Sequence, residues 1–253
     1  MKVRSYTDVL HRIQAVASGD RSWRVSEIAL LSYPSGRYPL VALCRPGEAG
    51  ALCLSLSAGI HGDEAAGVEA LLRFLESNLP RRFASVPLTV LPCQNPFGYE
   101  RHSRFNGCGL DLNRQFDKPD TPAQESIALR RFLLVRRPDL VVECHEDADA
   151  DGFYLWEIKR PGRPEIGRGV VDRISGAHPV TAARTVEGCF VTAGVAHPTA
   201  ERIRRIGGWS HTYFLFRNGT PHCLTPETPS SAPFEARVDM HLMAIRTVLE
   251  MTG

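Results

Sequence analysis

Residues 51–78, ALCLSLSAGIHGDEAAGVEALLRFLESN, contain a strand-like segment, a sharp corner and a helical segment in immediate succession. The run from Ala51 to Ala58 has only small or apolar side chains, which is typical of a strand buried on both faces of a sheet. The segment from Glu64 to Asn78 has helical periodicity, and its apolar face consists of Val68, Leu71, Leu72 and Leu75. A buried strand that leads into an amphipathic helix indicates an α/β fold.

The alternation of strands and helices continues on both sides of this unit. Further helices are predicted at Pro122 to Val135 and at Phe234 to Met251. Further strands are predicted at Trp23 to Leu31, Tyr38 to Cys44, Val86 to Pro92, Asp139 to Cys144, Phe153 to Ile158 and His222 to Thr225. We therefore expect a mixed, mostly parallel twisted β-sheet flanked by helices on both faces. The sequence has no internal repeat and RPGRP at 160–164 is interpreted as a loop, so residues 1–253 are predicted to form a single domain.

The composition is that of an ordinary globular protein and excludes several classes of function. The 253 residues are 43% hydrophobic and 23% charged, and no apolar run approaches the roughly 18 residues that span a membrane. The N-terminal segment lacks the apolar core of a secretory signal, so a cytoplasmic location is expected. A net charge of +2 argues against a nucleic-acid partner. The seven cysteines form no CxxC pair, so neither disulfides nor a cysteine-rich zinc site is expected.

The corner at residues 59–64 carries His61 and Glu64. An imidazole and a carboxylate three residues apart at a tight turn can bind one Zn²⁺, which accepts nitrogen and oxygen ligands. The pair alone is weak support, because short motifs recur by chance. Asp63 and Glu64 also suit the N-terminus of a helix, where acidic side chains complement the helix dipole. Both interpretations stay open on this segment.

His145 follows a second buried strand, at the end of DLVVECH (residues 139–145). Ligand sites in open α/β sheets gather at the carboxyl ends of strands, so His145 is a candidate third metal ligand. The alternative is a partly buried histidine that is satisfied by a backbone carbonyl. The interpretation of His145 as a metal ligand is supported only by the other candidate residues at similar corners.

Residues 95–116, NPFGYERHSRFNGCGLDLNRQF, form a loop-like segment rich in arginine and glycine. Its guanidinium and amide groups suit the binding of a carboxylate and come from Arg101, Arg104, Asn113 and Arg114. The alternative is a solvated basic loop. Apolar residues between the polar ones favour an anchored loop; these are Phe105, Leu110 and Leu112.

These blocks occur in an order that resembles the zinc carboxypeptidases of the carboxypeptidase A type, whose wider superfamily includes succinylglutamate desuccinylase and aspartoacylase. HGDE at 61–64 is similar to the family's HxxE zinc pair, and RFNGCGLDLNR at 104–114 is similar to its R…GxDxNR block. His145 resembles the third zinc ligand, and Glu227 in LTPETP resembles the catalytic glutamate. The ordered set spans Ser57 to Pro229 and is far more specific than any one motif.

The resemblance implies one zinc ion per chain, bound by His61, Glu64 and His145. It also implies that Glu227 is the general base, which takes a proton from the attacking water. Arg104 would then stabilise the oxyanion that develops during the reaction.

The resemblance assigns further residues to the substrate. Asn113 and Arg114 would hold its free carboxylate, and Asp111 would orient a zinc-bound histidine from behind. The family's carboxypeptidases also carry a tyrosine that covers the substrate. Its spacing is not matched clearly in this sequence; Tyr213 is the candidate and Tyr154 is a second one.

The implied function is a zinc-dependent metallocarboxypeptidase that hydrolyses the amide bond next to a free C-terminal carboxylate in small peptides. The first alternative is an N-acyl amino acid deacylase of the desuccinylase or aspartoacylase type, and loops 147–152 and 207–218 would decide between the two. The second alternative is a non-catalytic metal- or peptide-binding protein, which would have no need of a general base. The expected partner is a small peptide or N-acyl amino acid with a free carboxylate, not nucleic acid or a membrane; the oligomeric state is left open.

One competing motif is DADADG at 147–152, which matches the first six positions of a calcium-binding EF-hand loop. The twelfth position requires a bidentate glutamate, but Ile158 occupies it, and the flanking segments are predicted strands rather than helices. We therefore interpret the segment as an acidic loop near the mouth of the site. Of the remaining histidines, His102 and His211 are the two that could approach the site.

Overall fold

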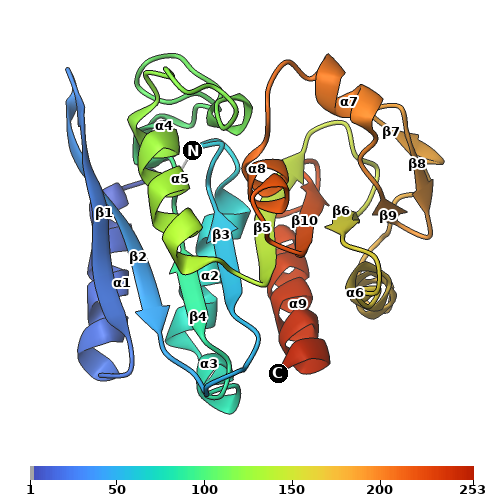
Figure 1. Ribbon diagram of the computed structural model, residues 1–253, viewed down its shortest axis with the longest axis horizontal. Coiled ribbons are helices and arrows are strands. Elements are labelled where there is room, and N and C mark those ends of the chain that lie inside the picture. The colour runs from blue at the N-terminus through green and yellow to red at the C-terminus, as the bar shows by residue number, and fades with distance from the viewer. Residues whose placement is uncertain (1–2) are drawn as a thin grey trace.

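The computed structural model describes residues 3–253, whose strands form one mixed sheet with helices on both faces (Figure 1). The strand order is β1-β2-β4-β3-β5-β10-β6-β9-β8-β7. The strands are β1 (Arg24–Tyr33), β2 (Gly36–Arg45), β3 (Leu54–Ala58), β4 (Leu88–Leu91), β5 (Leu140–Asp147), β6 (Tyr154–Lys159), β7 (Thr185–Val186), β8 (Cys189–Thr192), β9 (Val195–Ala196) and β10 (His222–Pro229). The predicted α/β class, with a mixed sheet and flanking helices, is confirmed. The expectation that the sheet is mostly parallel is wrong, because within residues 3–253 four of its strand pairs are parallel and five are antiparallel.

Parallel pairing is concentrated at the centre of the sheet, where β4, β3, β5 and β10 lie side by side. The flanking strands β2 and β6 pair antiparallel with this central group, and β1 and β2 form an antiparallel pair. Toward the other edge, β9 is parallel to β6 and antiparallel to β8. The strands β3, β5 and β10 therefore end at the same edge of the sheet. Their register places Ala58 beside Cys144 and Glu227 beside His145.

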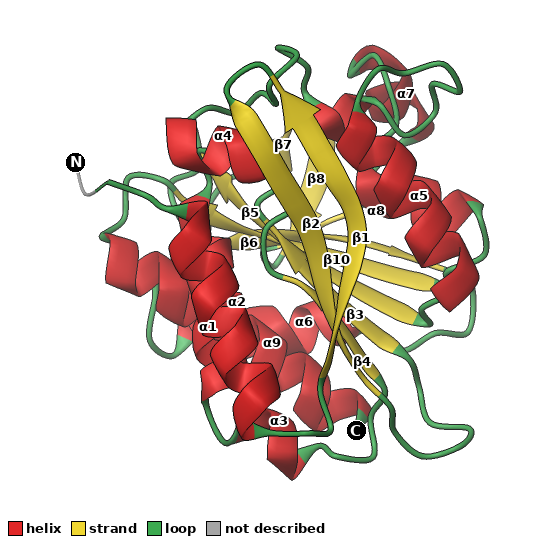
Figure 2. Cartoon of the chain, turned by 90° about the vertical axis from the view of Figure 1, so that its left-hand side faces the viewer, coloured by secondary structure: helices red, strands yellow, loops and turns green. Residues whose placement is uncertain are grey.

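Two layers of helices cover the sheet (Figure 2). One layer contains α1 (Tyr6–Gly19), α2 (Ala65–Glu76), α6 (Ile166–Ser175) and α9 (Phe234–Thr252), and α9 packs against both α2 and α6. On the opposite face, α5 (Gln124–Arg136) packs against β1, and α8 (His211–Arg217) packs against β10 and β6. The short helices are α3 (Leu79–Arg82), α4 (Pro96–Arg101), a 3-10 turn at Leu112–Arg114 and α7 (Ala200–Arg205).

The segment that opened the sequence analysis forms the centre of the fold. Every residue of β3 is buried, and α2 buries the predicted face of Val68, Leu71, Leu72 and Leu75. The largest extensions beyond a predicted strand end occur in β5 and β10. β5 continues to Asp147 and β10 continues to Pro229, because their parallel pairing extends to the contact between these two residues. This extension brings His145 and Glu227 into the ordered sheet.

Several elements were not predicted, because their signals in the sequence are narrow, interrupted or very short. The helix α1 buries only Tyr6, Val9 and Ile13, which makes a narrow apolar stripe. The helix α6 contains two glycines, which lower helix propensity. Strands β7 and β9 each have two residues, too few for an alternation to be detected.

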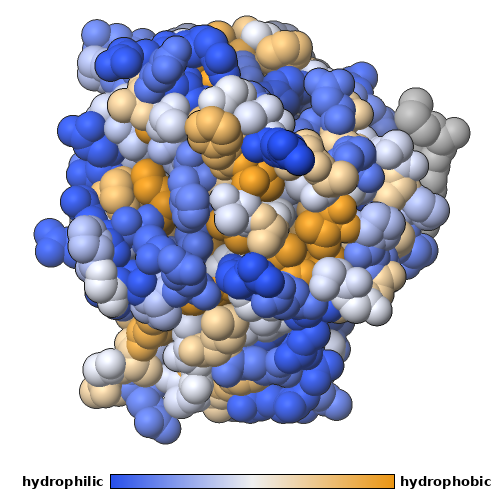
Figure 3. All heavy atoms as spheres, turned by 90° about the vertical axis from the view of Figure 1, so that its right-hand side faces the viewer, coloured by the Kyte–Doolittle hydropathy of each residue, from blue (hydrophilic) through white to orange (hydrophobic). Residues whose placement is uncertain are grey.

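The surface on the side of β7–β9 is mostly polar (Figure 3). Apolar side chains appear there in several patches among polar ones. Polar neighbours discourage an exposed sheet edge from pairing with another chain. No helix within residues 3–253 has both the length and the apolar composition needed to cross a membrane.

The close packing of α2 on β5 leads to a prediction about Gly67. A Cβ atom there would lie 2.7 Å from Cβ of Cys144 and 3.3 Å from its carbonyl oxygen. We expect Gly67→Ala to lower the free energy of unfolding by about 1–3 kcal/mol through overpacking, although alanine is the better helix former. Urea denaturation measures the change.

The control is Gly19→Ala, at the end of α1, where an added Cβ meets nothing within 4 Å. This variant should be neutral or slightly more stable than the wild type. An unchanged unfolding free energy for Gly67→Ala would contradict the close packing of α2 on β5.

Candidate active site

A cavity of about 640 Å³ is lined by residues from the ends of β5 and β10 and from the corner after β3. Eight of the nine predicted site residues line it: His61, Glu64, Arg104, Asn113, Arg114, His145, Tyr213 and Glu227. The ninth, Asp111, lies directly behind His61. The fold thus gathers around one cavity the residues that the sequence analysis took from separate blocks.

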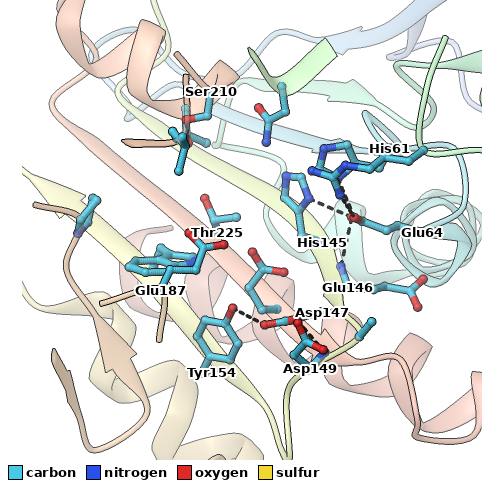
Figure 4. A pocket seen from close by; sticks show the side chains of 18 of the residues that line it. His61, Glu64, His145, Glu146, Asp147, Asp149, Tyr154, Glu187, Ser210 and Thr225 are labelled. Atoms are coloured by element: carbon cyan, nitrogen blue, oxygen red, sulfur yellow. Dashed lines mark hydrogen bonds and ion pairs between the residues drawn. The ribbon is translucent and has the colours of Figure 1, made fainter. Parts of the chain in front are cut away.

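The three predicted metal ligands meet at one point (Figure 4). His61 and Glu64 lie on the corner between β3 and α2, and His145 lies near the end of β5. The Glu64 carboxylate contacts Nδ1 of His61 at 2.5 Å and Nδ1 of His145 at 2.8 Å. One donor atom from each residue lies within 4.8 Å of the others, and all three residues are buried.

The donor set of this cluster fits a divalent metal ion. Without a metal, each contact between Nδ1 and the carboxylate needs a proton between the two atoms, and a cation takes the place of these protons. Two imidazole nitrogens and one carboxylate oxygen, facing a cavity, are a ligand set that leaves a position open for water. Burial by itself raises the pKa of Glu64, but His61 and His145 outweigh it and hold this pKa well below its usual range. Glu64 is therefore ionised and available as a ligand.

Asp111 and Arg104 support the cluster from the side of His61. Oδ1 of Asp111 lies 3.2 Å from Nε2 of His61, an arrangement that orients a metal-binding imidazole. Arg104 donates from Nη2 to Oδ2 of Asp111 at 2.9 Å, and its Nη1 atom lies 3.6 Å from Oε1 of Glu64. A guanidinium is thus held beside the metal ligands, where it can stabilise negative charge on a substrate oxygen.

Glu227 enters the cavity from β10, the strand next to β5. It lies opposite His145 in the parallel register and is half-buried. Burial raises the pKa of Glu227 to about 8; His145 opposes this increase, and Glu64, Asp147 and Glu187 add to it. The carboxyl group is thus adjacent to the metal-binding cluster and reachable from the cavity, as a group that exchanges protons with a substrate must be.

Asn113 and Arg114 lie in the 3-10 turn that follows Asp111. The Asp111 side chain accepts a hydrogen bond from the backbone N–H of Asn113 and so caps the turn. Oδ1 of Asn113 accepts from the backbone N–H of His211 at 2.8 Å, and Nη1 of Arg114 donates to the carbonyl of Asn113. An amide and a guanidinium therefore line the cavity at neighbouring positions.

Both candidate covering tyrosines line the cavity. Tyr213, on α8, packs edge-on against Trp209 and accepts a hydrogen bond from Arg217 at 3.3 Å. Tyr154, on β6, donates its hydroxyl to Asp147 at 2.7 Å (Figure 4). Tyr213 follows His211, which contacts Asn113, so it lies on the same side as the predicted carboxylate-binding residues.

The acidic segment 147–152 connects β5 to β6, so strands flank it and not the helices of an EF-hand. Asp147 and Asp149 line the cavity, whereas Asp151 accepts from the backbone N–H of Ala182. The segment thus contributes acidic side chains to the cavity, as the interpretation of an acidic loop predicts.

Two buried glutamates beside the cluster were not predicted. Glu143 is fully buried and contacts both His211 and His145. Glu146 accepts from the backbone N–H of Ala66 at the start of α2. A signal did exist for Glu143, because it interrupts the apolar run that ends at Cys144, and charged residues are rarely buried without partners. Of the two further histidines considered, His211 contacts Asn113, and His102 is not among the residues that line the cavity.

Residues 52–142 match a family model described as the succinylglutamate desuccinylase/aspartoacylase catalytic domain. A candidate metallopeptidase from Shewanella amazonensis has a similar solved structure, with 27% sequence identity and a TM-score of 0.83, covering 98% of this chain and 94% of that one. A metallo-carboxypeptidase from Burkholderia cenocepacia shares the fold at 18% identity and a TM-score of 0.72, covering 98% and 69%. A metallo-carboxypeptidase from Pseudomonas aeruginosa does so at 15% identity and a TM-score of 0.70, covering 98% and 69%. No curated protein sequence matches the chain.

The chain is similar to the zinc carboxypeptidase superfamily: the family model matches residues 52–142, and the solved relatives share the fold. This superfamily includes succinylglutamate desuccinylase and aspartoacylase, so the resemblance seen in the sequence is confirmed. The family model and the solved relatives indicate metallohydrolases, and the chain is an enzyme of that class. The match to the family model includes His61, Glu64 and the block 104–114 but ends before His145. The position of His145 beside the other two ligands therefore comes from the structure.

The cluster leads to the prediction that each chain binds about one equivalent of a divalent metal. His145→Ala should lose most of this metal, because only two ligands remain. Metal analysis of the purified variants after gel filtration measures the content. The control is His178→Ala, since His178 pairs with Asp239 and does not line the cavity. Full metal content in His145→Ala would contradict the assignment.

Proposed function

We propose that the protein is a zinc-dependent metallocarboxypeptidase that hydrolyses the amide bond next to a free C-terminal carboxylate in small peptides. The observation that carries this proposal is the arrangement of three sets of groups around one cavity. They are the cluster of His61, Glu64 and His145, the carboxyl group of Glu227, and the pair formed by Asn113 and Arg114. Together they provide for metal binding, proton transfer and carboxylate recognition.

Zinc bound by His61, Glu64 and His145 would supply Lewis-acid chemistry, because it lowers the pKa of a bound water to about 7 and polarises a carbonyl group. Glu227, on the neighbouring strand, would take the proton that the attacking water loses and pass it to the leaving amine. Arg104 is held in place by Asp111. Its guanidinium would stabilise the negative charge that develops on the scissile carbonyl oxygen.

Asn113 and Arg114 would bind the free carboxylate of the substrate through charge-assisted hydrogen bonds. Because the turn that carries them is capped by Asp111, which also contacts His61, this clamp has a fixed position relative to the metal-binding cluster. Because the distance between this clamp and the metal-binding cluster is fixed, binding of the carboxylate would also position the scissile bond at the cluster. The Pseudomonas aeruginosa relative was solved in complex with (2-guanidinoethylmercapto)succinic acid, and succinic acid carries carboxylates, which supports the proposal by analogy of fold.

A second candidate function is the deacylation of N-acyl amino acids, and the match to the desuccinylase/aspartoacylase family model favours it. Both reactions break an amide bond next to a free carboxylate and would use the same residues. They differ in the acyl group, which is a peptide in one case and a small acid in the other. Kinetics on both substrate classes therefore separates the two functions.

The role of Glu227 leads to a prediction about its amide variant. Glu227→Gln should keep its fold and metal content while kcat falls by about 10² or more, the scale expected when a positioned base is lost. The measurements are kcat, metal content and the thermal unfolding midpoint. If Glu227 were instead a turn residue between Pro226 and Pro229, stability would fall with little loss of activity. A near-normal kcat would remove Glu227 from the mechanism.

The carboxylate clamp leads to a prediction about substrate charge. The zinc-loaded wild type should prefer free-acid substrates over their C-terminal amides by a factor approaching about 10⁴, because the amide leaves buried donors unpaired. Arg114→Ala should weaken the turnover of free acids and barely change the turnover of the amides. The measurement is kcat/KM for free dipeptides, amidated dipeptides and N-acyl amino acids.

The control for this comparison is Arg168→Ala, since Arg168 is an exposed residue of α6 that pairs with Asp172. Its preference for free acids should equal that of the wild type. Similar wild-type rates on free and amidated substrates would overturn both the carboxypeptidase and the deacylase proposals.

A further inference from the structure

Glu143 is a fully buried carboxylate on β5, two residues before His145. Its Oε1 atom accepts a hydrogen bond from Nδ1 of His211 at 2.7 Å. Its Oε2 atom lies 3.5 Å from Nε2 of His145. Neither Oε2 of Glu143 nor Nε2 of His145 has a hydrogen-bond partner among residues 3–253, so two buried polar atoms without partners face one another.

Burial of this carboxylate needs a physical reason. The side chain is fully buried, and an ionised group removed from water is costly unless it is paired. The orientation of His145 supplies the reason. Its Nδ1 atom points at Glu64, so when Nδ1 binds a metal the ring proton resides on Nε2. Oε2 of Glu143 is placed to accept that proton in a hydrogen bond, which fixes the ring and raises its basicity.

The other oxygen of Glu143, Oε1, connects through His211 to the proposed clamp for the substrate carboxylate. His211, held through its ring by Glu143, begins α8. The backbone N–H of His211 donates to Oδ1 of Asn113 at 2.8 Å. Because Oδ1 is occupied in this way, the amide NH₂ group of Asn113 is the part left for a ligand in the cavity. Buried contacts thus run from His145 through Glu143 and His211 to Asn113.

We propose that Glu143 is a positioning residue that joins the metal-binding cluster to the carboxylate clamp. One oxygen orients His145 toward the metal, and the other holds His211 and, through its backbone, the side chain of Asn113. This inference rests on the proposed function for the role of Asn113. It adds that metal affinity and carboxylate recognition depend on one buried side chain that touches neither ligand.

The test is Glu143→Gln, which keeps the shape of the side chain but removes one of its two acceptors. The NH₂ group of the amide opposes the N–H of one imidazole, and its uncharged oxygen accepts more weakly from the other, so both contacts are weakened. We expect the affinity for Zn²⁺, measured by competition with a chromophoric chelator, to fall by about 10–100-fold. At saturating Zn²⁺, KM for a free-acid dipeptide should rise by about tenfold, the scale of one lost hydrogen bond, while KM for the amidated dipeptide stays unchanged.

The matched control is Glu157→Gln. Glu157 is also a buried glutamate of the same sheet, on β6, and it contacts Nε2 of His222 at 2.8 Å, but it does not line the cavity. The Glu157→Gln variant should be less stable than the wild type, but its Zn²⁺ affinity and its KM values should be unchanged. If Glu143→Gln does not fold, as judged by circular dichroism, Glu143→Asp takes its place. It keeps the charge, withdraws the carboxylate by one methylene group and should weaken Zn²⁺ binding in the same way.

The proposal requires both effects, so a Glu143 variant that loses only Zn²⁺ affinity or only carboxylate recognition overturns it. Equal losses in the Glu143 and Glu157 variants also overturn it, because they indicate a general effect of burial. If the wild type cleaves neither substrate class, the proposed function fails. Zn²⁺ affinity, together with calorimetric binding of N-acetylglycine and its amide, then still decides the role of Glu143.

Discussion

The carboxylate of Glu64 is buried at the start of α2, where it contacts His61, His145 and the backbone N–H of Glu146. A buried charge that loses its partners destabilises a protein by several kcal/mol, typically about 3–5. These contacts therefore constrain how the corner after β3 lies against the end of β5. The side chain that completes the metal-binding cluster thus also fixes the packing of the two strands that carry it.

The strand β5 serves both faces of the sheet, because successive side chains of a strand point in opposite directions. Glu143 and His145 face α8, where His211 lies. Glu146 faces the other layer, where it accepts from the backbone N–H of Ala66 in α2 and pairs with Arg237 in α9. Polar groups on both sides of one strand thus tie the two helix layers to the site. The site depends on the relative placement of these layers and not on a flexible loop alone.

The sequence predicted the parts of this arrangement that depend on local pattern. The apolar run at 51–58 identified β3, and its carboxyl end identified the corner with His61 and Glu64. Apart from the set of site residues that the family resemblance implied, the sequence could not predict contacts between distant segments. Glu143 and His211 lie 68 residues apart, and neither segment has a sequence pattern that indicates contact with the other. The lengths of β5 and β10 were underestimated for the same reason, since pairing between the two strands extends them past their apolar runs.

One wall of the cavity is formed by residues after β6. It shows most clearly that sequence pattern does not predict contacts between distant segments. Glu187 lies in a tight turn between β7 and β8, with a φ of 48°. It pairs with Nε of Arg202 at 2.6 Å, and the Arg202 guanidinium stacks over Trp156 at 4.0 Å. The two charges compensate one another, so this wall offers an ion pair and an aromatic face rather than an excess of one charge. His145 and Glu227 lie on the long strands β5 and β10, and His61 and Glu64 follow β3, whereas this wall is built by short elements. Sequence pattern therefore identifies the candidate metal ligands and the candidate base more readily than the residues that form this wall.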